Sequence, residues 1–127
     1  IVIVLPRDPD AAACHLLEAF RARLGFEIAI VLSDSWGRPW RLGTTGGALG
    51  AAGIATLRDL RGMPDLFGAP LRHSMQAVGD ELAAAANLVM GQAAEAVPAV
   101  VVRGFAFEGG DAGARALQRP REQDVFR

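Results

Sequence analysis

The chain contains no lysine, since all 13 of its basic residues are arginine, and it contains no tyrosine. A Schiff-base lysine and the lysine of a phosphate-binding P-loop are therefore excluded within these residues. The single cysteine, Cys14, excludes an internal disulfide and a zinc site built from several cysteines. Any metal must be bound by oxygen atoms, with His15 or His73 as the available nitrogen ligands.

Positive charge and long apolar runs are also missing. The formal net charge is -1 and the pI is about 6.1, so nucleic-acid binding through phosphate neutralisation is not favoured. The apolar runs are shorter than the ~20 residues of a membrane span, and no charged segment precedes a signal-like core. We therefore expect a cytoplasmic protein that binds neither nucleic acid nor membrane. Its 127 residues, 51% of them hydrophobic, suit one domain.

The first third of the chain predicts a strand, a helix and a second strand. Residues 1–5 and 27–32 are almost entirely apolar, as in strands covered on both faces. Between them, Asp8 can cap a helix over residues 9–24, and Gly25 can end it. Such a βαβ unit has a right-handed crossover and parallel strands. We expect an α/β or α+β fold, completed by a further helix and strand.

The rest of the chain predicts an ordered connection over residues 59–72, a helix over 75–90 capped by Ser74, and a strand over 98–103. On that helix we expect an apolar stripe to face the core; it comprises Met75, Val78, Leu82, Ala85 and Val89. The opposite face is small and carries Asp80, Ala83, Ala84 and Asn87. We expect this face to meet a ligand, a metal or another subunit, the alternative being an alanine-rich face in water.

Residues 43–53 are rich in glycine but match neither the P-loop pattern nor the dinucleotide-binding pattern. Glycine at positions 46 and 50 would let another backbone or a phosphate group approach closely. A tightly packed start of a helix is the alternative interpretation.

Residues 33–41 combine an acid, two arginines and two tryptophans directly after an apolar run. Asp34 would emerge at the carboxyl end of a strand, where open α/β sheets bind ligands. Asp34, Asp80 and Glu81 could bind Mg²⁺ or Mn²⁺, which prefer oxygen ligands. Consecutive helical residues point about 100° apart, so Asp80 and Glu81 share one ion only in a distorted helix or with two ions.

Two arginines would complement such a site, because the guanidinium groups of Arg38 and Arg41 can bind phosphate or carboxylate through paired hydrogen bonds. Ion pairs with Asp59 or Asp65 are the alternative. No catalytic nucleophile is identified, since Cys14 and His15 are adjacent on a helix and their side chains diverge.

At the level of whole motifs, the chain resembles the coenzyme F420-0:γ-glutamyl ligases, which attach glutamate to a deazaflavin cofactor precursor. The resemblance is carried by residues 5–10, 33–41, 59–68 and 79–91, and it extends through residues 101–104 and 122–127. The blocks D-x-x-G-R-P-W-R and D-x-R-G-x-x-D-L-F-G are its most specific parts.

This resemblance implies a GTP-dependent amide ligase that uses Mg²⁺ or Mn²⁺, with K⁺ as a further cation. GTP, L-glutamate and coenzyme F420-0 would be its substrates, and it would be a cytoplasmic homodimer. Asp34, Asp80 and Glu81 would bind the metal, and Arg38, Arg41, Thr45, Gly46 and Gly47 would contact nucleotide or substrate.

Members of that family are about twice as long. Residues 1–127 therefore resemble a single domain corresponding to the C-terminal half of the ligase, with the N-terminal half absent, and we expect this part alone to be inactive. The alternative function is a non-catalytic dimerisation or ligand-binding module derived from the ligase.

Overall fold

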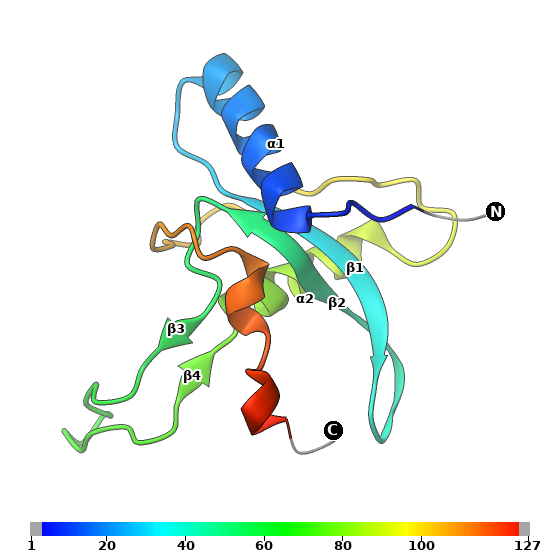
Figure 1. The fold of residues 1–127 in the computed structure, drawn as a ribbon. Helices are drawn as coiled ribbons and strands as arrows, with labels where there is room; N and C mark the ends of the chain where they lie inside the picture. The colour runs from blue at the N-terminus through cyan, green and yellow to red at the C-terminus, as the bar shows by residue number, and fades with distance from the viewer. Residues whose placement is uncertain (1–3, 125–127) are drawn as a thin grey trace.

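A computed structural model describes residues 4–124 (Figure 1). The elements are α1 (Pro9–Leu24), β1 (Ile30–Arg38), β2 (Arg41–Ala52), β3 (Arg58–Asp59), β4 (Met75–Gln76), α2 (Val78–Met90) and two 3-10 helices, η1 (Ala114–Leu117) and η2 (Arg121–Gln123). The strands form two antiparallel pairs, β1 with β2 and β3 with β4. The expected mixture of helices and strands is confirmed.

Helix α1 begins and ends where the sequence predicts. The Asp8 carboxylate accepts a hydrogen bond from the backbone N–H of Ala11 at 3.0 Å, and Pro9 occupies the first turn. Gly25 ends the helix in the left-handed conformation, with φ of 69°. Ala13 and Leu17 are its buried residues, and both pack against β2.

The predicted parallel βαβ unit is wrong for the described residues. Residues 1–3 of the first expected strand lie outside that part of the chain, and Val4 and Leu5 are not in a strand. Strand β1 pairs instead with β2 in an antiparallel hairpin, and the glycine-rich segment forms β2, which is neither a loop nor a helix start. Asp34 consequently lies inside β1, because the polar residues after the apolar run continue to pair with β2.

The hairpin lies between α1 and α2 (Figure 1). Alternate residues of each strand face opposite sides, so Ala52 packs against α1 while Ala51 packs against the start of α2. In β1, Ile30 and Leu32 face α1, and Val31 faces the α2 side. Coverage of this strand on both faces, as the sequence predicts, is confirmed.

Two glycines of β2 bring these layers unusually close. A Cβ atom on Gly46 would lie 2.5 Å from the Ala83 carbonyl oxygen of α2. On the other face, a Cβ atom on Gly50 would overlap the backbone of Pro9 in α1. The predicted close approach of another backbone at both positions is confirmed.

Helix α2 begins later than the sequence predicts. Its N-cap is Ala77, which makes no side-chain capping bond, whereas Ser74 was expected to cap a helix starting at residue 75. The reason is that Met75 and Gln76 pair with β3 as strand β4. The Gly79 N–H at the helix start donates to the Thr56 carbonyl at 3.0 Å, so a tertiary contact substitutes for the cap.

The prediction of which face of α2 meets the core is confirmed only in part. Val78 and Leu82 pack in the core as expected, but the small face, which was expected to meet a ligand, a metal or another subunit, is buried as well. Ala83 is buried against β2, and Asn87 lies on the same side near Gly46. Val89, which was expected to face the core, is 61% exposed. The glycine-rich surface of β2 admits small side chains at close range, so the small face of the helix packs inside.

Residues 98–103 form no strand, contrary to the prediction. The following segment is anchored by one backbone hydrogen bond, from Ala55 N–H to the Glu108 carbonyl at 2.8 Å. An apolar run with high strand propensity therefore forms no strand in the described structure.

The connection over residues 59–72 is ordered by backbone bonds, as predicted. Together with β3 and β4 it forms an arm that projects from the body of the molecule (Figure 1). Gly62 N–H donates to the Leu71 carbonyl and Leu71 N–H donates to the Met63 carbonyl, each at 2.8 Å. At the tip, the Asp65 carboxylate accepts from the N–H groups of Phe67 and Ala69.

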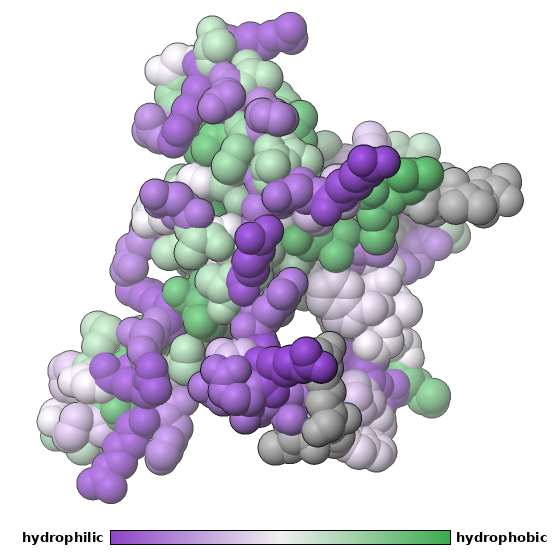
Figure 2. All heavy atoms as spheres, in the orientation of Figure 1, coloured by the Kyte–Doolittle hydropathy of each residue, from purple (hydrophilic) through white to green (hydrophobic). Residues whose placement is uncertain are grey.

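The core is small and much apolar surface remains exposed. Its buried hydrophobic residues are Ala13, Leu17, Ala51, Ala52, Ile54, Val78, Ala83 and Ala114. Hydrophobic side chains are exposed over α1, where Leu16 and Phe20 are 42% and 43% exposed (Figure 2). Within residues 4–124, no helix has the length and apolar character needed to cross a membrane. A surface of this kind is typical of a region that contacts further protein.

We expect Gly46→Ala to lower the free energy of unfolding by about 1–3 kcal/mol, because the added methyl group meets the backbone of α2. Gly37→Ala is the matched control in the same hairpin, since no heavy atom lies within 4 Å of its added Cβ. Urea unfolding measures both variants. Equal stability of the two would contradict the close contact between β2 and α2.

Candidate functional site

The β1–β2 hairpin carries the first of the predicted site residues, Asp34. Its side chain is exposed, and one carboxylate oxygen accepts from the Ser35 N–H at 2.7 Å. Ser35 pairs with Gly46, and this face of the hairpin contacts α2. Because successive strand residues project to opposite faces, the Asp34 side chain lies on the face turned away from α2.

Asp80 and Glu81 lie in the first turn of α2. One Asp80 carboxylate oxygen accepts from the Ala48 N–H of β2 at 2.9 Å. The Glu81 carboxylate is exposed and accepts from the Gln76 side-chain amide at 2.7 Å. Both acids therefore have local partners, and Asp80 joins the helix to the strand.

The expectation that Asp34 shares one ion with Asp80 or Glu81 finds no support in this arrangement. The hairpin separates the Asp34 side chain from α2, and residues 4–124 contain no group of three or more His, Cys, Asp or Glu side chains able to hold a metal ion. The roles of Asp34, Asp80 and Glu81 as metal ligands stay predictions. A metal site at any of them would need oxygen ligands from other groups.

Arg38 and Arg41 face each other across the end of the hairpin. Both are exposed, and neither forms an ion pair within the described part of the chain. Directly opposed residues on an antiparallel pair project to the same face, where like charges destabilise the pairing. Two arginines thus lie opposite each other at the end of the hairpin, with no ion pair to the described residues.

The alternative of ion pairs with Asp59 or Asp65 is not found. Asp59 pairs with Arg61 at 2.6 Å, and Asp65 caps the tip of the arm. The side-chain hydrogen bond from Arg61, followed by its backbone hydrogen bond, lowers the pKa of Asp59 to about 2. This exposed pair holds the base of the arm and leaves Arg38 and Arg41 free to bind an external anion.

The predicted nucleotide or substrate contacts at Thr45, Gly46 and Gly47 lie within β2. Both glycines are buried: Gly46 lies against Ala83, and Gly47 lies under the indole ring of Trp36. The space next to both glycines is therefore filled by the protein itself. Thr45 is half-buried, and its contact with a ligand stays a prediction.

Gln92 is a polar centre that the sequence did not reveal. Its side-chain oxygen accepts from the hydroxyl groups of Ser35, at 2.8 Å, and Thr44, at 3.4 Å. Its amide nitrogen donates to the Asn87 side chain at 2.8 Å and to the Gly91 carbonyl at 3.1 Å. Gln92 thereby connects the outer half of the hairpin to the end of α2. No local pattern marks a glutamine after a helix end for this role.

Asp10 is a second residue that the sequence analysis missed. One of its carboxylate oxygens accepts from the N–H groups of Ala51, at 2.9 Å, and Ala114, at 2.7 Å. The other accepts from the Arg115 N–H at 3.3 Å. The only signal in the sequence is an acid in the first turn of a helix, which commonly interacts with the helix N-terminus alone.

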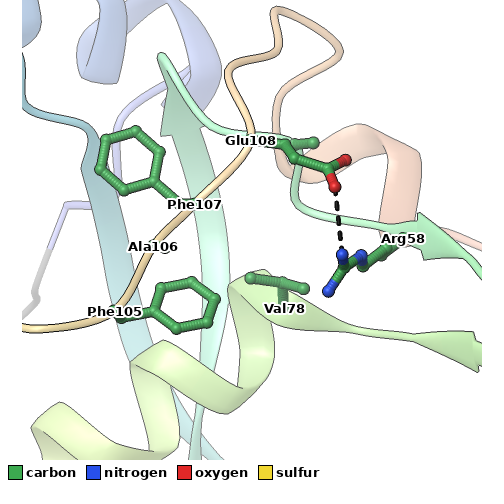
Figure 3. A pocket seen from close by; sticks show the side chains of 7 residues that line it. Arg58, Val78, Phe105, Ala106, Phe107 and Glu108 are labelled. Carbon is green, nitrogen blue, oxygen red and sulfur yellow. Dashed lines mark hydrogen bonds and ion pairs between the residues drawn. The ribbon is translucent and has the colours of Figure 1, made fainter.

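Two hollows of the described chain are unsuited to a nucleotide, one because of its volume and the other because of its lining. One, with a volume of about 30 Å³, is lined by Ala55, Arg58, Val78 and residues 105–108, and the Arg58–Glu108 ion pair lies at its edge (Figure 3). This volume is sufficient for about one or two water molecules. A wider hollow of about 460 Å³ is lined by Met90, Ala96, Val97 and Pro98, which offer no charged group. The hairpin surface remains the better candidate for binding an anion.

Comparisons with known proteins agree with the sequence motifs. The model of the family described as F420-0:Gamma-glutamyl ligase matches residues 1–104. A coenzyme F420:L-glutamate ligase from Methanothermobacter thermautotrophicus is 50% identical over 97% of this chain and 50% of its own length. Ligases of the same name from Methanopyrus kandleri and Methanocaldococcus jannaschii are 46% and 43% identical, over 52% and 50% of their lengths. The chain thus spans about half the length of these relatives.

Two substitutions separate the hydrogen bond that Asp80 accepts from the effect of its charge. We expect Asp80→Ala to lower the free energy of unfolding by about 1–3 kcal/mol, because the Ala48 N–H loses its acceptor. Asp80→Asn retains an acceptor oxygen without the charge, so it should preserve most of the stability. Urea unfolding distinguishes them. Equal losses in both variants would show that the charge of Asp80, rather than its hydrogen bond, stabilises the contact.

Proposed function

Because the chain belongs to the F420-0:Gamma-glutamyl ligase family, we propose that it forms part of an enzyme that joins L-glutamate to coenzyme F420-0 in F420 biosynthesis. The observation that carries this proposal is the hairpin, where an exposed carboxylate and two arginines with no ion pair within residues 4–124 extend from one pair of strands. These residues lie in the motif block with the most specific likeness to the family.

We infer that GTP drives the reaction, as the resemblance implies. A carboxylate oxygen of the acceptor attacks the γ-phosphorus of GTP, and GDP leaves. The amine of glutamate then attacks the acyl carbon, phosphate leaves, and the amine loses a proton as the amide forms. Phosphoryl transfer of this kind depends mainly on positioning and on neutralising charge, so the absence of lysine and of an activated nucleophile is compatible with it.

In this reaction the guanidinium groups of Arg38 and Arg41 would hold the transferring phosphate or the acceptor carboxylate. Arg38 and Arg41 lie opposite each other at the end of the hairpin and form no ion pair within residues 4–124. Ser35, Thr44 and Gln92 would keep the hairpin in position through their hydrogen bonds. Paired hydrogen bonds from guanidinium to phosphate fix orientation as well as charge.

We propose that the complete enzyme depends on Mg²⁺ or Mn²⁺, with K⁺ as a further cation. The carboxylates described in one copy do not form a site by themselves, so Asp34 would bind the ion together with groups supplied by the rest of the enzyme. A divalent cation would neutralise the charge on the phosphates of GTP. Asp80 and Glu81 retain proposed roles, although both have partners within the chain.

We propose further that the active enzyme is a cytoplasmic homodimer. The relatives are about twice as long as this chain, and the chain exposes large hydrophobic residues on several elements. Leu88 and Val89 on the outer face of α2 are 88% and 61% exposed. Further protein, from the rest of the enzyme or from a second copy, would cover such residues.

We expect the 127-residue chain alone to form no γ-glutamyl product. We then join this chain to the half of the Methanothermobacter thermautotrophicus relative that it does not match. This chimera should glutamylate coenzyme F420-0 in the presence of GTP and Mg²⁺ or Mn²⁺. In that chimera Asp34→Asn should reduce kcat by about 10²–10³, because a charge at the phosphoryl-transfer site is lost. Chromatography of the deazaflavin products measures the rate.

Asp111→Asn, an exposed carboxylate in the loop before η1, is the matched control and should leave the rate unchanged. Turnover by the short chain would contradict the need for the other half. A chimera that folds but neither turns over nor binds GTP would favour the alternative, a non-catalytic module. Full activity of the Asp34→Asn chimera would remove the proposed role of Asp34.

The proposed dimer has a separate test. We expect sedimentation equilibrium to show self-association of the chain at high micromolar concentration, driven by exposed apolar residues of α2. Leu88→Ser should weaken it, whereas Ala85→Ser on the same helix changes less apolar surface and serves as the control. A clean monomer at these concentrations would count against the dimer.

A further inference from the structure

The turn of the β1–β2 hairpin holds a tryptophan in a conformation that suits glycine. Trp40 has φ of 57°, in the left-handed region that residues with a Cβ atom adopt at a cost. It follows Pro39, whose ring fixes φ near −65°. A proline followed by a left-handed residue is the pattern of a type II turn, whose second central position favours glycine or asparagine. The backbone itself therefore gives no reason for tryptophan here.

The Trp40 side chain gains nothing from packing in exchange for this strain. It is 90% exposed, and the neighbouring Leu42 is 101% exposed. An indole ring presented in this way offers a flat apolar face with one N–H donor. Strained residues that the fold nevertheless retains often mark sites of contact with a ligand.

The charges next to Trp40 point to an anionic partner. Arg38 and Arg41 flank the turn, form the last pair of the hairpin, and have no ion pair within residues 4–124. Their mutual repulsion would be relieved by an anion bound between the two guanidinium groups. A ring surface and an anion site thus occur together on four consecutive residues.

We propose that this hairpin tip, residues 38–41, binds a planar aromatic ring that carries an anionic group. The ring stacks on Trp40, and the anion lies between Arg38 and Arg41. This inference rests on the proposed function for the identity of the ring, which is the deazaflavin of the acceptor. Guanine with its phosphates has the same chemistry, so the experiment must distinguish the two sources.

Flavin mononucleotide is the probe for the acceptor, because it combines a flavin ring with a phosphate, and its own fluorescence falls when the ring stacks on tryptophan. Titration of the 127-residue chain should give saturable quenching. Trp40→Gly and Trp40→Asn should weaken binding about tenfold, as loss of one stacking partner commonly does. The melting temperature of both variants should equal or exceed that of the unsubstituted chain, because glycine and asparagine suit the left-handed turn. Trp40→Phe, which keeps an aromatic ring at this position, should bind flavin mononucleotide more tightly than either variant.

The arginines are tested in the same titration. Arg38→Gln and Arg41→Gln should weaken flavin mononucleotide binding, make it less sensitive to salt, and leave the binding of riboflavin, which lacks the phosphate, unchanged. Arg72→Gln, an exposed arginine of the arm, is the matched control. Tighter binding of flavin mononucleotide than of GTP assigns the tip to the acceptor, whereas the reverse order assigns it to the nucleotide. Either order supports the binding of an anionic aromatic ring at the tip, and the second order overturns its identity as the deazaflavin.

Binding of flavin mononucleotide that is absent, or unchanged by Trp40→Gly and by both arginine substitutions, overturns the proposal. Loss of self-association in Trp40→Gly with unchanged flavin binding also overturns it, in favour of a protein contact. These titrations contain no glutamate and require no turnover. If the chimera stays active when Trp40, Arg38 and Arg41 are substituted, the binding proposal for the tip fails while the proposed ligase function stands. If flavin mononucleotide binding depends on these residues but the chimera is inactive, the proposed ligase function fails while the binding proposal stands.

Discussion

The close contact between β2 and both flanking helices is the constraint on which the rest of this structure depends. Gly46 lies against the backbone of Ala83 in α2, and Gly50 lies against the backbone of Pro9 in α1. Since no side chain separates these layers, acidic side chains of both helices reach N–H groups of the strand. Asp80 accepts from Ala48, and Asp10 accepts from Ala51. The helices are therefore held to β2 by hydrogen bonds as well as by apolar contact.

This arrangement supports the inner half of the hairpin and leaves its end to project. Near Ser35 the hairpin is held to the end of α2 by the hydrogen bonds of Gln92 and by the contact of Gly46 with Ala83. Beyond that point Trp40 and the side chains of Arg38 and Arg41, the last pair of the hairpin, are exposed to solvent. A rigid base with an exposed, charged tip suits a binding element, because the base fixes the position of the tip before the ligand arrives.

The modest core is consistent with a chain that spans half the length of its relatives. Most of its buried hydrophobic residues are alanines, which remove little apolar area from water compared with leucine or phenylalanine. Meanwhile larger side chains, among them Leu66 and Phe67 at the tip of the arm, are over 90% exposed, at 93% and 91%. The tip turn is itself well bonded, so these two side chains are presented in a defined position. Exposed apolar side chains held in this way are typical of a surface that contacts further protein.

The sequence by itself determined the features that depend on neighbouring residues. The limits of α1 follow from Asp8, Pro9 and Gly25, because capping and the left-handed stop are local interactions. The need for close packing at Gly46 and Gly50 was also readable, because only glycine lacks a Cβ atom. The motif blocks identified the family, since they carry the specific residue combinations of its members.

The tertiary structure decided the pairing of strands and the orientation of α2. An apolar run shows that a segment is buried but not which partner its N–H and C=O groups meet, so β1 could be read as part of a parallel unit. On α2, Val78 and Leu82 face the core as expected, but the glycine-rich surface of β2 also packs against the small side that carries Ala83. The partners of Asp10, Asp80 and Gln92 are distant in the chain, and only the folded backbone brings them within hydrogen-bonding distance.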